Sequence, residues 1–457
     1  MCRGYLKIFF LLIISTVILF SEGRAETVEK LQGKCMTCHK RETPGLYNQW
    51  ATSEHGSKNV TCYSCHQAGA TDVDAFKHEG LTIATLVTPK DCGRCHERQE
   101  EEVQKSHHAK AGRILDSLDN YLAGVVGGSP AVIAGCEMCH GSVVKIDNKS
   151  PNKLSKKSWP NTGIGRVNPD GSEGSCSACH SRHAFSLEQS REPENCGKCH
   201  LGPDHPQKEI YEESKHGIAY RYAHAAGKMN MDRKKWIVGE DYFNAPTCAT
   251  CHLSATSTMQ STHDVGDRLS WNLRPPVSKP KKNSKAKRAK MISVCKNCHG
   301  QRFIEGFYSQ YDGVVNLYDQ KFGIPAKEIM AILKKNKSFK NQNKFTNDVE
   351  WLYWEIWHHE GRRARMGAAM GGPDYTWWHG IYDVAKHFYV KFIPGVEKLK
   401  DKEANAYIEK LLKTDWHKWY RNASTKEIMA ELKSGKMEKS YSSLFTPPWE
   451  RVKKVKK

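Results

Sequence analysis

Hydrophobic residues recur at helical spacing in the last third of the chain. In five segments apolar side chains lie three and four positions apart. Proline- and glycine-containing breaks separate these segments, at Pro325, Gly371-Gly372-Pro373 and Pro394-Gly395. Because this period is that of an amphipathic helix, the region after residue 300 is predicted to be helical with little sheet. The predicted helices cover residues 326–335, 348–369, 381–392, 402–414 and 424–434.

The earlier part of the chain lacks this regular period and contains two irregular stretches. Residues 149–175 are rich in proline and glycine, which predicts a long loop. Residues 278–290 are rich in lysine and arginine, which predicts a solvated basic linker. A second interpretation makes the basic stretch a docking strip for an acidic cytochrome.

The N-terminus has the pattern of a secretory signal. Arg3 and Lys7 come before the mostly apolar residues 8–20, and Ala25 offers a small residue before a cleavage point. This run is too short to cross a bilayer comfortably, although an uncleaved anchor is the alternative. We therefore predict a signal peptide over residues 1–25, export to a periplasm or an equivalent compartment, and no stable membrane span after processing.

Cysteine and histidine occur in one repeated pattern, Cys-x-x-Cys-His, present eight times before residue 300. In the c-type haem signature two thiols form thioethers with the porphyrin and the adjacent imidazole binds the iron. A zinc knuckle gives no reason for a histidine after every second cysteine. Sixteen of the seventeen cysteines lie in the motifs, which leaves none for a disulfide framework. The sequence therefore predicts eight covalently attached haems, on Cys35, Cys38 and His39; Cys62, Cys65 and His66; Cys92, Cys95 and His96; Cys136, Cys139 and His140; Cys176, Cys179 and His180; Cys196, Cys199 and His200; Cys248, Cys251 and His252; and Cys295, Cys298 and His299.

Composition is consistent with an interior filled by haem. Only 39% of the residues are hydrophobic and the mean hydropathy is -0.66, a poor supply of apolar side chains for a chain of 457 residues. Porphyrin faces can replace the missing side-chain core. We predict an all-α multihaem cytochrome c fold, with a haem-packed octahaem domain over residues 26–300 and a haem-free helical domain over residues 301–457.

The formal net charge of +20 omits the cofactors. Two propionates give each ferric haem a net charge of about -1, so eight haems offset roughly 8 positive charges. The remaining excess can steer a soluble, acidic redox partner, for which a cytochrome is the predicted type. Nucleic acid is the wrong partner for an exported haem protein.

Fourteen of the 22 histidines lie outside the motifs, enough to supply a second axial ligand to every iron. Electron-transfer haems use such a second ligand, whereas a catalytic haem needs an open position for substrate. His55 and His216 share a Ser-x-His-Gly context, and His183 and the adjacent pair His107 and His108 resemble it. For each candidate the alternative is a surface or hydrogen-bonded histidine. The predicted distal ligands are His55, His108 (or His107), His183 and His216, followed by His224, His263 and His78.

Four further segments carry a resemblance to a known family: residues 176–183, 196–206, 262–266 and 373–380. Together with eight motifs and a haem-free C-terminal region, they resemble the octahaem cytochromes of hydroxylamine oxidoreductase type. The resemblance implies that the fourth haem is catalytic and five-coordinate, with His140 behind its iron.

The resemblance also implies the lining of the catalytic pocket. Asp204 and His205 match an adjacent pair that handles protons, although the alternative is a turn in which Asp204 caps the backbone. Tyr308 is the first choice for a pocket phenol, with Tyr311 and Tyr318 as alternatives.

A homotrimer is implied as well, in which a tyrosine of the neighbouring subunit is joined to the catalytic porphyrin. Tyr375 is the first choice for that tyrosine, ahead of Tyr382 and Tyr389. The predicted function is oxidation of a small inorganic nitrogen compound, hydroxylamine or hydrazine, with electrons leaving through bis-histidine haems. The alternatives are a nitrite or nitric oxide reductase that uses the same site, and a non-catalytic electron-transfer protein.

Overall fold

The computed structural model describes residues 33–116 and 118–451, so the predicted signal peptide and Cys2 lie outside the described residues. The chain forms two compact units. Unit 1 comprises the chain up to residue 190 together with residues 263–265, and unit 2 comprises residues 191–262 and 266–457. Unit 1 carries the first five motifs and unit 2 carries the last three.

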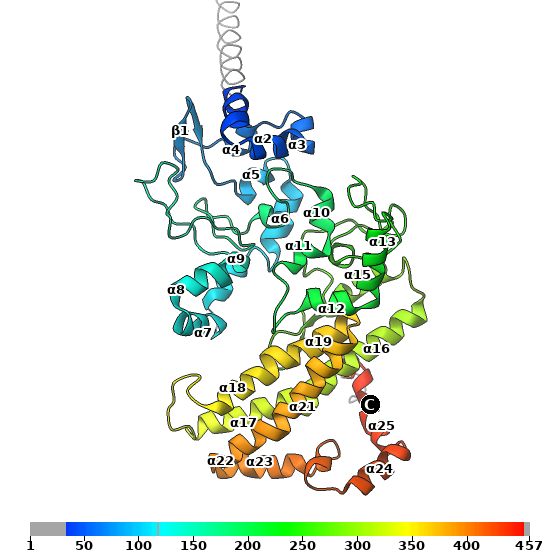
Figure 1. The fold of residues 1–457 in the computed structure, drawn as a ribbon. Helices are drawn as coiled ribbons and strands as arrows, with labels where there is room; N and C mark the ends of the chain where they lie inside the picture. The colour runs from blue at the N-terminus through cyan, green and yellow to red at the C-terminus, as the bar shows by residue number, and fades with distance from the viewer. Residues whose placement is uncertain (1–32, 117, 452–457) are drawn as a thin grey trace, which may run out of the picture. The chain divides into compact units, whose positions relative to one another are not determined.

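The predicted all-α fold class is confirmed. The described residues contain only two small sheets, each an antiparallel pair of strands, while helices are the main regular structure of both units (Figure 1). Among the described residues no helix has the length and apolar character that a membrane span requires.

Unit 1 is built from short helices joined by loops (Figure 1). Short helices suffice here because a haem motif occupies little more than one helical turn. Residues 33–42 are helical and include the first motif. The other elements are α2 (Pro44–Ala51), α3 (Glu54–Ser57), α4 (Cys62–His66), β1 (Phe76–His78), β2 (Leu81–Ile83), α5 (Pro89–Gly93), α6 (Glu97–Lys105), η1 (Ala111–Asp116), α7 (Leu118–Val126), α8 (Gly128–Ala131), η2 (Val132–Cys136), α9 (Glu137–His140), η3 (Cys176–Ala178) and α10 (Leu187–Arg191).

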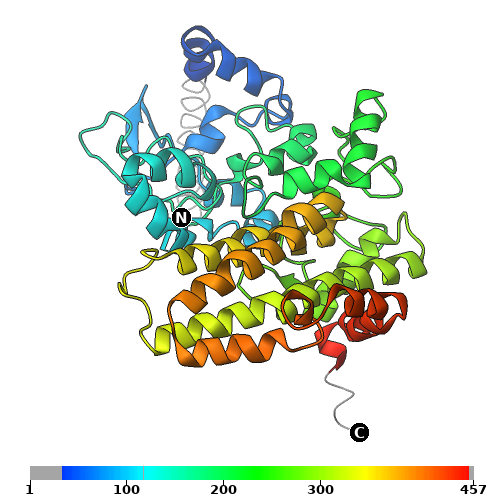
Figure 2. The ribbon, with the colours of Figure 1, turned by 60° about the horizontal axis from the view of Figure 1, so that its bottom comes forward.

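Unit 2 begins with short motif helices and continues into long ones. The long helices lie side by side in both views (Figures 1 and 2). Its elements are α11 (Pro193–Gly197), α12 (Gln207–Glu213), α13 (Lys215–Ala225), α14 (Cys248–His252), β3 (Trp271–Asn272), β4 (Lys279–Pro280), α15 (Ser284–Cys295), α16 (Gln301–Tyr318), η4 (Asp319–Gly323), α17 (Ile324–Lys335), α18 (Asp348–Trp354), η5 (Glu355–Glu360), α19 (Gly361–Met370), α20 (Pro373–Thr376), η6 (Trp377–Tyr382), α21 (Asp383–His387), η7 (Phe388–Phe392), α22 (Ile393–Lys398), α23 (Lys402–Leu412), η8 (Lys418–Tyr420), α24 (Thr425–Lys433), α25 (Lys436–Tyr441), η9 (Ser442–Phe445) and α26 (Pro448–Arg451).

The long helices bury an apolar core of their own. Ile329, Leu333, Phe388 and Phe392 are fully buried, and the same cluster extends along the chain to Leu412. These residues recur at helical spacing, so each helix presents one apolar stripe to its neighbours. The five predicted C-terminal helices are confirmed as helical, but residues 326–335 and 381–392 are parts of longer continuous runs, residues 301–335 and 373–398.

Two predicted breaks do not interrupt the helices. Pro325 and Pro394 each lie in the first turn of a helix that directly continues the preceding one. In both cases a π-helical turn comes just before, η4 and η7. A π turn shifts the hydrogen-bond ladder, so the missing N–H of proline is accommodated and the helix continues. The sequence reasoning also missed α16, although Ile304, Tyr311 and Val315 supply a helical stripe there.

The predicted basic linker is ordered in the structure. Its first residues pair as β4 with β3, and the rest forms α15. Helix α15 ends at Cys295, so the basic stretch leads directly into the eighth motif. Several of its cations have partners within unit 2; Lys290, for example, bonds Asp267 at 2.7 Å.

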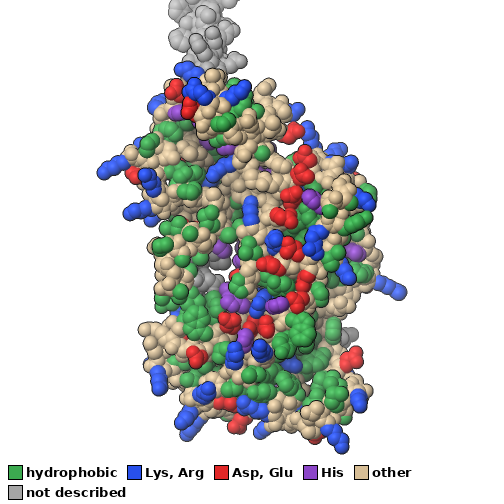
Figure 3. Space-filling view, viewed as in Figure 1, with side chains coloured by type: hydrophobic (Ala, Val, Ile, Leu, Met, Phe, Trp, Pro, Cys, Tyr) green, Lys and Arg blue, Asp and Glu red, His purple; other side chains and the backbone are tan. Residues whose placement is uncertain are grey.

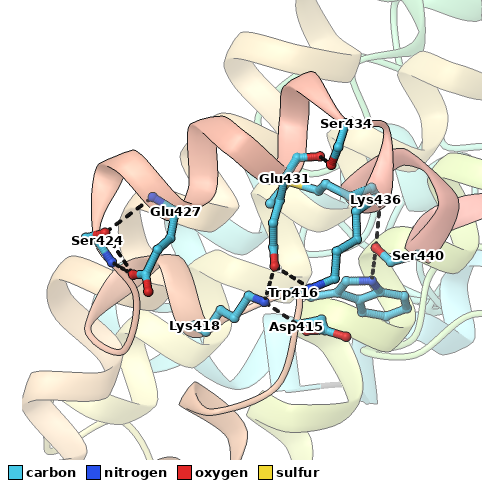
Figure 4. Close-up of polar contacts among 10 residues, drawn as sticks. Asp415, Trp416, Lys418, Ser424, Glu427, Glu431, Ser434, Lys436 and Ser440 are labelled. Carbon is cyan, nitrogen blue, oxygen red and sulfur yellow. Dashed lines mark hydrogen bonds and ion pairs between the residues drawn. The ribbon is translucent and has the colours of Figure 1, made fainter.

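Polar contacts hold the last helices together (Figure 4). The Lys418 ammonium lies between two carboxylates, 3.0 Å from Asp415 and 2.8 Å from Glu431. Lys436 bonds the same Glu431 oxygen at 2.6 Å. The Ser424 hydroxyl and the Glu427 carboxylate form the capping box at the start of α24.

Candidate haem ligands and catalytic iron

Local sequence starts the helices of four motifs. Thr61 and Thr247 cap the helices of the second and seventh motifs, and Pro89 and Pro193 begin those of the third and sixth. In the third motif the N–H of the histidine donates to the carbonyl of the first cysteine at 2.9 Å. This i to i+4 bond brings both thiols and the imidazole to one end of a single turn. None of the sixteen motif cysteines, all of which lie in the described residues, forms a disulfide.

The second cysteine of a motif is placed by a backbone hydrogen bond to the first. In four motifs its N–H donates to the carbonyl of the first cysteine, at 3.1 Å for Cys95 and Cys298 and at 3.2 Å for Cys179 and Cys199. This i to i+3 bond tightens the turn and keeps the two cysteines close together.

The second cysteines of several motifs lie near the surface of the polypeptide. Cys38, Cys95 and Cys298 are exposed, and Cys179 and Cys199 are only half-buried. A porphyrin attached to these thiols would cover them. Haem attachment through these five thiols stays a prediction, which the intact mass of the haem-loaded protein checks.

Six motif histidines each face a second histidine at one narrow spacing. Two imidazoles on opposite sides of one iron, with metal–nitrogen bonds of about 2 Å, should have ring centres roughly 6.2 Å apart. The observed separations fit this value. In unit 1 the pairs are His39–His78 (6.3 Å), His66–His183 (6.3 Å), His96–His55 (6.2 Å) and His180–His263 (6.5 Å). In unit 2 they are His200–His205 (6.0 Å) and His299–His216 (6.0 Å).

Burial favours the neutral, ligating form of these imidazoles. Desolvation lowers the pKa of His183 to about 4 and lowers the pKa values of His55, His216 and His263. A neutral imidazole keeps a lone pair for a metal, whereas a protonated one does not.

Apolar side chains flank the motifs where haem faces would lie. Phe303 stacks on His299 with ring centres 4.6 Å apart, yet 63% of its surface is exposed. Met138, Val143 and Leu201 are also about half exposed beside their motifs. Thiols, facing imidazoles and flanking apolar groups together fit a covalently bound haem at these positions.

Some histidines predicted or available as ligands have other contacts. His224 Nε2 lies 3.6 Å from a Glu192 carboxylate oxygen, and its ring packs on Tyr220. His379 bonds Asp374 at 2.6 Å, and buried His417 shares a 2.8 Å hydrogen bond with Tyr389.

His107 and His108 lie in the turn that follows α6. The His108 carbonyl accepts from the Ala111 N–H at 3.1 Å, which fixes the backbone of this turn. The assignment of His108, or His107, as a distal ligand stays a prediction.

The fourth motif is held by the loop after it. Ile164 N–H donates to the Cys139 carbonyl at 2.9 Å, and Gly165 N–H donates to the His140 carbonyl at 3.1 Å. Asn161 donates its amide to the Ser142 carbonyl at 3.1 Å. The predicted loop over residues 149–175 is therefore irregular in form, but part of it is a specific cradle for the fourth motif.

Glycines make this cradle possible. Gly141, directly after His140, has a φ of 77°, and among the eight motifs, all of which the structure describes, no other is followed by a glycine with positive φ. A Cβ at Gly141 would meet the Arg166 amide nitrogen at 2.5 Å, and one at Gly163 would meet the Gly141 nitrogen at 2.0 Å. The two backbones approach more closely than any side chain allows.

Asp204 and His205 lie in unit 2, in a turn after the sixth motif. The Arg362 guanidinium fixes the Asp204 carboxylate at 3.2 Å, while His205 Nε2 lies 3.7 Å from the other carboxylate oxygen. The His205 ring faces His200, an arrangement that the sequence reasoning did not include. The five-residue spacing from His200 to His205 was the available signal.

The two tyrosines expected at the catalytic site also belong to unit 2. Tyr308 on α16 packs under the Arg288 guanidinium, 4.4 Å from the ring centre, and burial raises the pKa of its phenol. Tyr375 is partly buried in α20, where its N–H donates to Glu213 at 3.2 Å and its ring stacks on His379.

Thiols of different motifs are neighbours, which indicates which haems would be adjacent. Cys92 of the third motif contacts Cys176 of the fifth, and Cys196 of the sixth contacts Cys248 of the seventh. Cys251 of the seventh motif also lies near the eighth. The third and fifth motifs of unit 1, and the three motifs of unit 2, therefore lie in close succession, as electron transfer between haems requires.

Two families match parts of the chain. The family described as "Seven times multi-haem cytochrome CxxCH" matches residues 169–345, and "Cytochrome c7 and related cytochrome c" matches residues 128–201. With the motifs and their geometry, these matches define the chain as a multihaem c-type cytochrome with covalently attached haem.

The chain is also similar in sequence to a protein of hydroxylamine oxidoreductase type. A probable nitrite reductase-hydroxylamine oxidoreductase fusion protein of Kuenenia stuttgartiensis is 24% identical over 461 residues, which cover 76% of this chain and 49% of the relative. The chain thus spans about half the length of that curated relative.

Solved structures share the fold. A hypothetical multiheme protein aligns with a TM-score of 0.69 and 25% identity, covering 83% of this chain and 96% of the other. A reducing hydroxylamine-oxidoreductase-like protein complex of Kuenenia stuttgartiensis aligns with a TM-score of 0.59 and 20% identity, covering 84% and 88%.

Proposed function

We propose that this chain is an exported octahaem oxidoreductase that oxidises hydroxylamine, or hydrazine, at one haem iron and passes the electrons through bis-histidine haems to a soluble redox partner. The observation that carries the electron-transfer part is the set of six histidine pairs at the spacing of two ligands on one iron. Six-coordinate haems of this kind exchange electrons without binding substrate.

The fourth motif is the proposed catalytic position. The resemblance to octahaem hydroxylamine oxidoreductases supports it, and so does the unusual cradle around Gly141. Iron bound there would supply a Lewis acid and an electron acceptor for the nitrogen compound. His140 would lie behind that iron, and the cradle hydrogen bonds to Cys139 and His140 would fix its orientation.

The roles of Asp204 and His205 are revised in this proposal. His205 faces His200 and is proposed as the distal ligand of the sixth iron rather than as a proton acceptor. Proton handling then rests on Asp204, whose carboxylate Arg362 holds in place. Tyr308 is proposed as a supporting phenol.

Ligand binding to the haem-loaded protein tests the catalytic position. Cyanide added to the oxidised protein, and nitric oxide added to the reduced protein, should perturb the spectrum of one haem only. Gly141→Ala should alter that response because its Cβ would press on Arg166, whereas Gly171→Ala has an equally positive φ but open space and should not. If no haem responds in the unmodified protein, the chain is the non-catalytic electron-transfer protein of the second alternative.

Distal ligation is tested by removing single imidazoles. His183→Ala and His205→Ala should each convert one low-spin haem to a high-spin form, seen by electron paramagnetic resonance. His224→Ala should leave the spin state of every haem unchanged, because its contacts are with Glu192 and Tyr220. If His205→Ala leaves the spin state of every haem unchanged, His205 returns to the proton-handling role.

A reductive direction is the second candidate, and the solved reducing complex favours it. We propose Tyr375 as the residue that decides between them. A bond between Tyr375 of one copy and the porphyrin of another would be seen as a mass increase or an altered Soret band that Tyr375→Phe removes. Its presence would support hydroxylamine oxidation, and its absence together with nitrite or nitric oxide reduction would support the reductase.

We propose that the chain assembles as a homotrimer or a larger complex. An apolar groove of about 1010 Å³ lies among the C-terminal helices of unit 2, with Trp377, Tyr382, Val390 and Trp419 partly exposed along it. Apolar side chains also reach the surface among charged ones on the face shown in Figure 3. A further copy of the chain is the proposed occupant of the groove. Light scattering should give a trimer mass that Val390→Glu lowers, and a monomeric unmodified protein would contradict this.

A further inference from the structure

A buried arginine connects three haem motifs of unit 1. Arg166 has 1% of its surface exposed. Its backbone lies against Gly141 after the fourth motif, and its carbonyl accepts from Gly174 N–H at 2.7 Å, just before the fifth motif. Its guanidinium donates to the Val87 carbonyl at 2.9 Å, just before the helix of the third motif.

The Arg166 charge is not neutralised by its hydrogen-bond partners. Besides Val87, the guanidinium donates to the Asn168 side-chain oxygen at 2.7 Å and to the Asn161 carbonyl at 3.4 Å. All three acceptors are uncharged. Asp170 exerts some attraction, but this exposed carboxylate is bound to Thr88 at 2.7 Å and to Ser172.

The charge is close to two attachment thiols. Cys92 and Cys176, which contact each other, are both within electrostatic range of Arg166. A fixed positive charge in a low-dielectric interior stabilises the reduced form of a nearby haem, which carries one positive charge less than the oxidised form. The effect on the reduction potential is therefore positive.

We propose that Arg166 raises the reduction potentials of the haems on the third and fifth motifs and so makes this pair an electron acceptor for the fourth. The inference rests on the proposed function, in which electrons originate at the fourth haem. Arg166 acts as a positioning residue for the three motifs and as a fixed charge, and it touches no substrate.

Potentiometric titration of the haem-loaded protein tests the charge directly. Arg166→Met should lower the midpoint potentials of two haems. The expected shift is about 59 mV, which corresponds to a tenfold change in each one-electron equilibrium constant. Arg166→Lys should recover most of the shift, because it restores the charge without the full set of hydrogen bonds. Arg41→Met, at an exposed arginine paired with Glu42, is the matched control and should change nothing.

Asp170→Asn gives an independent test if Arg166→Met fails to load haem. Removing this negative charge should raise the potentials of the same two haems by less than Arg166→Met lowers them. His55→Met replaces the proposed second ligand of the third haem and so alters the absorption of that haem. The altered absorption shows whether the third haem is one of the two whose potentials shift.

The outcomes separate this inference from the proposed function. Unchanged potentials in Arg166→Met, or a downward shift in Asp170→Asn, would overturn the role of Arg166. If the potentials shift as expected but no haem binds cyanide or nitric oxide, the fixed charge stands and the catalytic assignment falls.

Discussion

The haem-bearing unit 1 and the C-terminal helices of unit 2 hold themselves together by different means. Among the described residues, one cluster of twenty buried apolar side chains joins the helices between Tyr318 and Leu412. In unit 1 the corresponding cluster has three, Leu86, Val144 and Leu154. A chain segment with so small a core cannot stabilise a fold by side-chain burial alone. The comparison indicates that haem is structural as well as functional in unit 1.

The largest difference between the two regions is expected when the full chain is expressed without haem attachment. We expect proteolysis to cut readily within residues 33–190, because the apolar faces of the haems are missing there. The helices between residues 301 and 412 should resist, since their core consists of side chains. Fragment masses after limited digestion provide the measurement. Equal protection of both parts would show that unit 1 has a sufficient core of its own.

In the haem-loaded protein, truncation of a buried side chain should cost more stability in the C-terminal helices than in unit 1. Phe388→Ala should cost about 3–5 kcal/mol, because Phe388 is fully buried in the large cluster. Leu86→Ala removes a smaller side chain from the small cluster and should cost about 2–3 kcal/mol. Urea unfolding followed by circular dichroism compares the two. A larger cost at Leu86 would contradict the view that side chains matter less in unit 1.

A buried lysine makes the stability of the C-terminal helices depend on pH. Burial lowers the pKa of Lys321 from 10.5 to about 8, although its ammonium retains a 3.0 Å bond to Tyr441. Below pH 8 the folded state carries this buried charge at a cost of roughly 3 kcal/mol at most. From pH 8 to 10.5 the unfolded chain still binds the proton and the folded one does not, so stability rises with pH.

Lys321→Met should remove that dependence. We expect the variant to be more stable than the unmodified protein by about 1–2 kcal/mol at pH 7, since the lost bond to Tyr441 offsets part of the gain. The difference should shrink as pH approaches 10.5. Denaturation curves between pH 7 and 10 provide the check, and a difference that grows with pH would refute the explanation.

The smallest effect is expected at the surface ion pairs of Figure 4. Lys418→Met breaks contacts with Asp415 and Glu431, and Lys436 retains its bond to Glu431. Ion pairs at a protein surface contribute little and are screened by salt. The melting temperature should fall slightly in low salt and hardly at all in high salt. A large loss at both salt concentrations would show that this network is essential.

Sequence reasoning predicted the C-terminal helices well because the spacing of apolar residues that marks a helix is a local property of the chain. Residues such as Ile329 and Phe388 recur at a period that any helix must follow. It placed helix ends at Pro325 and Pro394 wrongly, because the π turns that absorb these prolines depend on hydrogen-bond register rather than on residue type. The basic composition of residues 278–290 predicted a linker. In the structure this segment is ordered, because its first residues pair with β3 and the rest forms the helix that ends at Cys295.

The sequence by itself determined the chemistry of the cofactor, since thiols and an imidazole within one helical turn are a local arrangement that the spacing alone specifies. It also supplied most of the candidate second ligands. Only the tertiary structure decided which histidine faces which, because His183 and His66, or His263 and His180, are distant in the chain and meet only through folding. The position of Arg166 among three motifs was likewise invisible in the sequence, because its contacts with Val87 and Gly141 join segments that no local pattern connects.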